Sequence, residues 1–436
     1  MSTAAAQKAA VEKSRTWFLN APKASMLQKQ ELTARGSRIK GPFRTEQVSV
    51  PAPSEQDLWE QLWGVVSDIR EDGEIIERPD YAHTLGGEWT DLLAASPPRT
   101  PRGNDSISRI MLYFHGGSYN SGSPVAARPI ITILCKRNTF RAFAPKYRLG
   151  PQHTFPAQLL DALVAYFFLI APPPGASHRA ISPSSIVFVG ESAGASLALA
   201  VMQALLHIRR KQTRYTPKLL FHGHEIAVDL PAGCALLSVV GDWTFSLPSN
   251  QRHLNTDILV GEPWLQPDFP PDSIWPSDPP RGEAFCHPTA LCHPLISPAL
   301  CRDWTGASPM WICSGEETLA DSMMLIVQTA ARQGVSVDFA QYKGMPHVFP
   351  WLMRELPQAT HAYDNWAAAC TTFVHSRQAS GKAAVFGLGD LKPHDLDVRN
   401  LVSLTHDEAF EMMKLGRARK IRNVFTGSLK NRPSRM

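Results

Sequence analysis

Short apolar segments alternate with longer segments of helical periodicity between about residue 107 and residue 376. The short segments hold four to eight residues with little polar alternation, which is typical of strands covered by helices on both faces. We therefore predict strands at 110–114, 141–145, 185–189, 234–239, 310–313 and 335–342, and helices at 125–136, 157–170, 193–209, 319–333 and 358–374. This alternation predicts an α/β fold with a mostly parallel central sheet flanked by helices.

Two regions depart from this alternation. Residues 1–105 give mixed helical and loop signals and no strong strand pattern. Residues 243–299 combine many prolines with the aromatic residues Trp243, Phe245, Trp264, Phe269, Trp275 and Phe285. We interpret this stretch as an insertion that forms part of a cap over a site, and an irregular structural loop is the alternative. The chain is thus divided into an N-terminal segment (1–105), a core (106–378, with the insertion at 243–299) and a C-terminal extension (379–436).

The formal net charge of +5 comes from the end of the chain. After Glu411 there are eight basic residues and no acidic one, and the remainder holds 36 basic against 39 acidic residues. A basic tail can contact an acidic membrane surface or nucleic acid. The tail shows no aromatic-basic pattern, however, so we interpret it as a loop-rich, solvated terminus without a nucleic-acid partner.

The composition, with 44% hydrophobic and 19% charged residues, is that of a globular chain and excludes disorder throughout. No apolar segment reaches the length of a membrane span, because the longest, at 159–171, is interrupted by Asp161. Residues 1–30 lack the continuous apolar stretch of a secretory signal. Several cysteines lie in apolar segments, which favours a reducing compartment, and we expect a cytoplasmic protein without stable membrane insertion.

The near-repeat Cys286-His287-Pro288 and Cys292-His293-Pro294 raises the alternative of a metal pair. Neither spacing fits the usual zinc patterns, so we expect no metal and no cofactor.

The motif Gly190-Glu191-Ser192-Ala193-Gly194 follows a predicted strand and precedes a predicted helix. This is the context of a nucleophile elbow, in which a sharp turn projects the serine clear of the sheet. The next N–H lies at a helix N-terminus, where a developing negative charge is stabilised. We therefore predict Ser192 as a nucleophile and Ala193 as an oxyanion donor.

The residues His115-Gly116-Gly117 follow the predicted strand at 110–114. Glycines allow the main chain to approach a ligand closely, so the N–H groups of Gly116 and Gly117 are predicted to complete an oxyanion hole with Ala193. A plain glycine turn is the alternative. His115 is interpreted as a residue that orders the loop.

A serine nucleophile needs a base that is oriented by an acid, and in α/β hydrolases the chain order is serine, acid, histidine. His347 lies in a loop after the predicted strand at 335–342 and is the best-placed base. The acid is expected after the preceding strand, where Glu317 is our choice and Glu316 and Asp321 are alternatives.

These motifs resemble those of the hormone-sensitive-lipase-like branch of α/β hydrolases, whose patterns are H-G-G-G, Y-R-L-x-P-E, F-P-A, G-D-S-A-G and D-P-L-x-D. The chain shows them in order over about residues 110–376, including Tyr147-Arg148-Leu149 and Phe155-Pro156-Ala157. It departs from them in Ser118 for the third glycine, Glu191 for the elbow aspartate and Glu317 for the catalytic aspartate. The resemblance supports Glu317 as the acid and implies that residues 1–105 and 243–299 build a cap.

The resemblance implies a serine esterase that hydrolyses short- to medium-chain esters of small lipophilic molecules, among them acetylated sterols or secondary metabolites. One alternative is amide hydrolysis in the same fold, as in arylformamidases. Another is a catalytically silent receptor such as the gibberellin receptor, which resembles this family but lacks the histidine. The sequence is compatible with an oligomer and does not define one.

Overall fold

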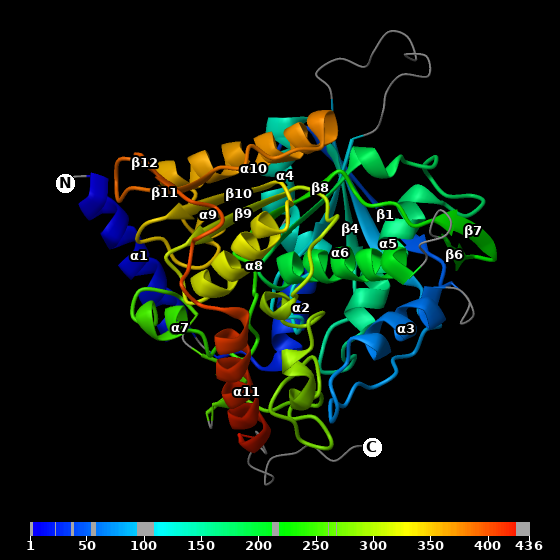
Figure 1. Cartoon of the computed structure of the whole chain (residues 1–436), viewed down its shortest axis with the longest axis horizontal. Helices are drawn as coiled ribbons and strands as arrows, with labels where there is room; N and C mark the ends of the chain where they lie inside the picture. The colour runs from blue at the N-terminus through cyan, green and yellow to red at the C-terminus, as the bar shows by residue number, and fades with distance from the viewer. Residues whose placement is uncertain are drawn as a thin grey trace.

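The computed structural model describes residues 3–21, 23–35, 39–53, 58–93, 109–211, 218–259, 261–266 and 268–423. Its main sheet has the strand order β1-β2-β4-β3-β5-β8-β9-β10-β11-β12 (Figure 1). The central strands run parallel to one another: β4 (Arg141–Lys146), β3 (Ile110–Phe114), β5 (Ile186–Glu191), β8 (Gly233–Leu237), β9 (Met310–Gly315), β10 (Val337–Tyr342) and β11 (Ala383–Phe386). The six predicted strands and the mostly parallel sheet are confirmed.

Helices cover both faces of this sheet, as predicted. One face packs against α4 (Pro124–Asn138) and α10 (Pro357–Ser376), and the other against α5 (Ala157–Ile170), α6 (Ala193–Lys211) and α8 (Ala320–Arg332), with α3 (Glu60–Asp68) beside α6. A hydrophobic core lies on each face. Along β3, Leu112 belongs to the core under α5, α6 and α8, whereas Met111 and Tyr113 belong to the core under α4 and α10. Because successive strand residues point to opposite faces, a fully apolar strand serves two cores at once.

The N-terminal segment contributes two strands, although its residues show no strong strand pattern. After α1 (Thr3–Asn20) and α2 (Met26–Arg35), β1 (Phe43–Val50) pairs antiparallel with β2 (Leu85–Leu92), which pairs antiparallel with β4. Both strands are only partly apolar: β1 is at the edge of the sheet, and β2, between β1 and β4, carries Gly86 and Gly87 against the side chains of β4. The proposed boundary at 105/106 lies outside the described residues.

The insertion at 243–299 is well packed although it has little regular structure. It holds α7 (Pro248–Arg252) and the 3-10 turns η3 (Pro263–Leu265), η4 (Pro288–Cys292) and η5 (Pro298–Leu300). Trp264, Phe269 and Trp275 form a small core of their own with Met26 of α2. Trp243 packs instead on Tyr119, with ring centroids 5.2 Å apart. The aromatic residues thus fix the insertion to the N-terminal helices and to the core.

Five of the eight basic residues at the end of the chain lie in a helix, so the expectation of a loop-rich, solvated terminus is wrong for that part. After β12 (Pro393–Leu396), α11 (His406–Arg422) packs against the insertion at η4 and η5 (Figure 1). Lys420 is buried, and its ammonium group donates to Trp243 O (2.6 Å) and contacts Glu262 and Glu283. The last basic residues, from Lys430 on, lie outside the described residues.

The two Cys-His-Pro segments begin turns. The imidazole of His287 accepts a hydrogen bond from Thr289 N, and that of His293 accepts one from Leu295 N. In the part of the chain that the structure describes, no group of three metal-ligating side chains is found. None of the described helices is both long and apolar enough to cross a bilayer.

Candidate active site

Ser192 stands at the turn between β5 and α6. Its φ is +55°, a left-handed conformation that is unusual for a residue other than glycine and typical of a nucleophile elbow. The turn fits because Gly194 has no side chain: a Cβ there would lie 2.1 Å from Phe114 O on the neighbouring strand. The predicted strand–serine–helix arrangement is confirmed.

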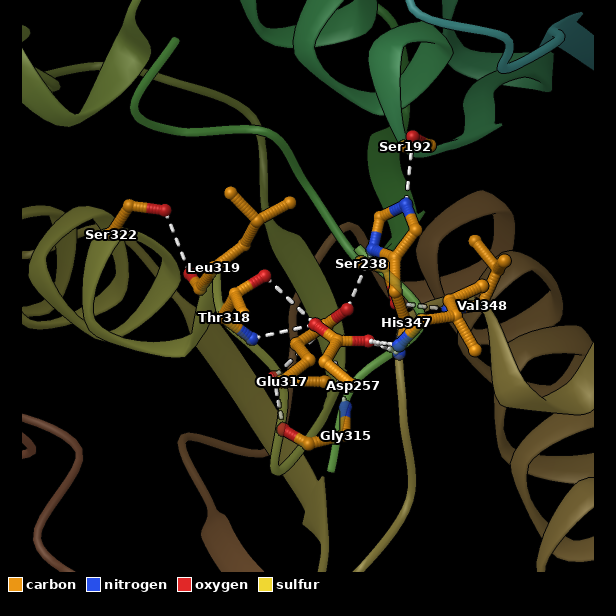
Figure 2. A network of polar contacts seen from close by, with 12 residues as sticks. Ser192, Ser238, Asp257, Gly315, Glu317, Thr318, Leu319, Ser322, His347 and Val348 are labelled. Carbon is orange, nitrogen blue, oxygen red and sulfur yellow. Dashed lines mark hydrogen bonds and ion pairs between the residues drawn. The ribbon is translucent and has the colours of Figure 1, made fainter. Parts of the chain in front are cut away.

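His347 lies in the loop that follows β10, and its ring connects Ser192 with Glu317 (Figure 2). The Ser192 hydroxyl is 2.8 Å from His347 Nε2, and His347 Nδ1 is 2.6 Å from Glu317 Oε2. With Nδ1–H donating to the carboxylate, Nε2 is free to accept the serine proton. The three side chains come from the carboxyl ends of β5, β9 and β10, the edge at which open α/β sheets bind ligands.

The three carboxylates considered for the acid have different partners. Glu317 is fully buried and contacts His347. Glu316 accepts a hydrogen bond from Gly344 N (2.8 Å), and Asp321 accepts from Ser249 N (2.8 Å) and binds Arg252. Of the three, Glu317 is the carboxylate that orients the imidazole.

Burial and charge act in opposite directions on this pair. Burial raises the pKa of Glu317, against the lowering effect of His347. For His347, burial lowers the pKa, but the carboxylates of Glu317, Asp257 and Glu191 together raise it above its usual value. The pair is therefore disposed to stabilise an imidazolium, the state that the base reaches when it takes a proton from serine.

One of the expected oxyanion donors is already occupied. The Gly116 N–H donates to Glu191 Oε1 at 2.7 Å, so Gly116 is removed from the predicted set. The physical reason is that the glutamate in the elbow reaches back to the glycine loop. The N–H groups of Gly117, Ser118 and Ala193 donate to no acceptor among the described residues. Only glycine fits at position 117, because φ is +111° there and a Cβ would lie 2.4 Å from Ser121 O.

Glu191 also accepts a hydrogen bond from the hydroxyl of Tyr113, and burial raises its pKa to about 7. It therefore ties the glycine loop to the elbow. His115 has the expected ordering role: its Nδ1 hydrogen bonds to Gly116 O at 2.8 Å, and its ring stacks on Tyr147. Burial lowers the pKa of His115 to about 4, so it is neutral near neutral pH.

Two further residues support the catalytic loops and were not predicted. Ser238 accepts a hydrogen bond from Val348 N at 3.1 Å and bonds to Glu317 (Figure 2). Asp257, in the insertion, contacts the loops of His347 and Glu317. Neither residue belongs to a motif, and hydrophobic periodicity gives no signal for either, because their contacts join segments that are distant in the sequence.

A cavity of about 340 Å³ adjoins Ser192. It lies between the glycine loop, the start of α4, the N-terminal helices and the insertion, and its apolar lining includes Phe18, Ile130, Ile258, Leu259 and Trp351. A mostly apolar cavity with a few polar groups at one end is the usual form of a small-molecule site. The arrangement of sheet, elbow serine, histidine and carboxylate defines the α/β-hydrolase class.

Comparison with known proteins agrees with this class. Residues 111–351 match the family described as alpha/beta hydrolase fold, and the chain belongs to that family. The chain is similar to an acetyl-hydrolase of Streptomyces hygroscopicus, with 30% identity over 257 residues, 59% of this chain and 73% of that protein. It is 29% identical to an esterase of Acinetobacter venetianus over 61% of this chain and 76% of that protein.

A further relative is lipase 2 of Moraxella sp., which is 27% identical over 72% of this chain and 71% of that protein. Among solved structures, an esterase of the bacterial hormone-sensitive lipase family superposes with a TM-score of 0.56 over 84% of this chain and 98% of that one, at 20% identity. The expected fold and enzyme class, a carboxylic ester hydrolase, are confirmed.

Proposed function

We propose that this chain is a serine esterase that hydrolyses short-chain carboxylic esters of small apolar molecules, with Ser192 as nucleophile, His347 as base and Glu317 as the acid that orients it. The observation that carries the proposal is the continuous hydrogen-bonded series from Ser192 Oγ through the imidazole to Glu317 beside an apolar cavity.

Each half of the reaction moves one proton through His347. Ser192 Oγ attacks the ester carbonyl while Nε2 accepts the hydroxyl proton, and the imidazolium is stabilised by Glu317. The N–H groups of Gly117, Ser118 and Ala193 donate to the oxyanion of the tetrahedral intermediate. The intermediate collapses, the alcohol leaves with the proton from Nε2, and water then releases the acid from the acyl-enzyme by the same steps.

The cavity indicates the size of the substrate. Its volume of about 340 Å³ lies at the lower end of the range of about 300–1,000 Å³ for small-molecule sites. The described residues of its lining include no Lys, Arg or Asp, and Glu191 is already occupied by Tyr113 and Gly116. Acetyl and other short acyl esters of an apolar alcohol fit these properties, and one relative is named an acetyl-hydrolase.

Labelling with a fluorophosphonate probe tests the nucleophile. We expect the wild type to label and to hydrolyse p-nitrophenyl acetate faster than long-chain esters, and Ser192→Ala to lose labelling and about 10⁶-fold in turnover. The matched control is Ser196→Ala, one helical turn further on, whose hydroxyl donates to Val240 O and which should label normally. A folded wild type that neither labels nor turns over would support the silent receptor. Faster hydrolysis of anilides than of matched esters would support an amidase.

A further inference from the structure

Asp257 is a buried carboxylate between α7 and η3 of the insertion, with no exposed surface. Its Oδ1 accepts hydrogen bonds from His347 N (2.8 Å) and from Ile258 N (2.7 Å). Its Oδ2 accepts from the main-chain N–H of Thr318 (2.7 Å) and from the Thr318 hydroxyl (2.8 Å). Four donors therefore converge on this side chain, as expected of an ionised buried carboxylate.

These bonds join two loops that the sheet itself holds only at their starts. Glu317 follows β9 and His347 follows β10, so the strand ladder fixes where each loop begins. Asp257 lies between the loops and bonds to the main chain of His347 and to the residue after Glu317 (Figure 2). One carboxylate thus fixes the separation of the catalytic base and its acid without touching the imidazole.

The same residue connects these loops to the substrate cavity. Ile258 and Leu259, which follow directly, line the cavity beside Ser192. Arg15 of α1 donates from Nε to the main-chain carbonyl of Asp257 at 3.1 Å and from its guanidinium to Leu254 O. The N-terminal helix, the insertion and both catalytic loops therefore meet at Asp257.

We propose that Asp257 is a positioning residue for ester hydrolysis, which holds the His347 and Glu317 loops in register with the cavity wall that the insertion supplies. The proposal rests on the proposed function, because it assigns a role in that reaction.

The charges around His347 provide a readout that a merely space-filling residue would not move. Three carboxylates act on the imidazole: Glu317 from the β9 loop, Asp257 from the insertion and Glu191 from the elbow. The charge of Asp257 also acts to raise the pKa of His253, on the same segment, and that of Glu317. Burial lowers the pKa of His347 and the carboxylates raise it, so loss of the Asp257 charge lowers that pKa.

The main experiment compares the wild type with Asp257→Asn over a range of pH, with p-nitrophenyl acetate as substrate. We expect kcat to fall by about 100-fold, the loss typical of a displaced catalytic group, with little change in KM. We also expect the acidic limb of the kcat/KM profile to move to lower pH. Folding is checked by circular dichroism and urea unfolding.

A matched control is Asp242, which directly precedes the insertion. This carboxylate is also buried, and it accepts hydrogen bonds from Thr244 N (2.7 Å) and Ser246 N (2.8 Å) within its own turn. Asp242→Asn removes a buried charge from the same region but no contact with either catalytic loop. We expect wild-type kcat and an unshifted acidic limb.

A milder variant separates geometry from charge. Thr318→Val removes one of the four hydrogen bonds to Asp257 and leaves its charge, so kcat should fall less and the acidic limb should stay in place. This variant also decides the matter if Asp257→Asn does not fold.

The inference is overturned if the wild type labels and turns over while Asp257→Asn keeps its kcat and its pH limb. It is likewise overturned if Thr318→Val has the wild-type kcat when Asp257→Asn is unfolded. A wild type that neither labels nor hydrolyses esters contradicts the proposed function instead, so the two failures are distinguishable.

Discussion

Two buried charged clusters in this molecule are built in different ways. At the edge of the sheet, Glu317 and His347 come from loops after neighbouring strands and lie beside an open cavity. In the second cluster, Lys420 of α11 is enclosed by Glu262 and Glu283 of the insertion and by the carbonyl of Trp243. In the first cluster, His347 also binds a residue outside the charged pair, Ser192. In the second, the Lys420 ammonium group binds the two glutamates and the Trp243 carbonyl that enclose it.

The difference separates groups held for chemistry from groups held for structure. Burial raises the pKa of Glu317, which means that its charged form is disfavoured where it stands. In the second cluster, burial lowers the pKa of Lys420, but the two glutamates raise it well above its usual value, so the cation is favoured. Loss of a charge should therefore reduce activity in the first cluster and stability in the second.

Among the variants that test this comparison, the largest effect is expected for Glu317→Gln. The amide has the shape of the acid but does not stabilise the imidazolium, so kcat/KM should fall by about 10⁴-fold. The pKa values of Glu317 and His347 are higher in the folded state than in the unfolded state. Their contribution to the free energy of unfolding is therefore lost as the pH rises. The variant should thus gain stability relative to the wild type as the pH rises from 4.5, measured by urea unfolding at a series of pH values.

The matched control for that variant is Glu316→Gln at the adjacent position, which should keep its activity because Glu316 binds Gly344 N and not the imidazole. A Glu317→Gln enzyme with wild-type kcat/KM would contradict the assignment of the acid.

Lys420→Met is the next largest change. It leaves Glu262 and Glu283 buried without their cation, and breaking a buried pair in this way costs about 3–5 kcal/mol of the free energy of unfolding. Turnover per folded molecule should be unchanged, since the cluster contacts no catalytic residue. Urea unfolding and active-site titration with the fluorophosphonate probe measure the two quantities separately.

The comparison for Lys420 is Lys414→Met on the same helix. Lys414 pairs with Glu411 at 2.7 Å on the surface, where such pairs contribute little, so stability should hardly change. Equal losses in the two variants would show that α11 is stabilised by its charge as a whole rather than by the buried cluster.

The smallest effect is expected at the start of α11. Thr405 caps this helix: its hydroxyl accepts from Glu408 N, and the Glu408 carboxylate accepts from Thr405 N. Thr405→Ala should lower the free energy of unfolding by about 1 kcal/mol, with Ser403→Ala, an exposed serine outside the cap, as control. No change in the urea midpoint would indicate that α11 is held by its packing alone.

The central strands and covering helices could be predicted because each is a continuous apolar or periodic segment, as in 110–114 and 193–209. β1 and β2 could not, since β1 is a half-exposed edge strand and β2, although largely buried, contains Gly86 and Gly87. The helix α11 was missed for a similar reason: its sequence is dominated by charged residues, and its stability comes from Lys420 and from contacts with the insertion.

The chemical groups of the site could be predicted because each has a local signature: Ser192 in its elbow, and Glu317 and His347 in loops after predicted strands. The donor set could not be predicted fully. Gly116 reads as an oxyanion donor until the carboxylate of Glu191, which is 75 positions away, is seen to occupy its N–H.

The sequence by itself determined the central parallel strands, the chain order of Ser192, Glu317 and His347, and the enzyme class, because backbone propensity and motif spacing act over short stretches of chain. Only the tertiary structure decided that the Gly116 N–H is bound by Glu191, how α11 is bound and what holds the loops of Glu317 and His347. Those outcomes depend on buried carboxylates such as Glu191, Asp257 and Glu283. A buried carboxylate needs hydrogen-bond donors, and in the folded chain these donors come from segments that are distant in the sequence. The residues next to the carboxylate therefore do not predict its partners.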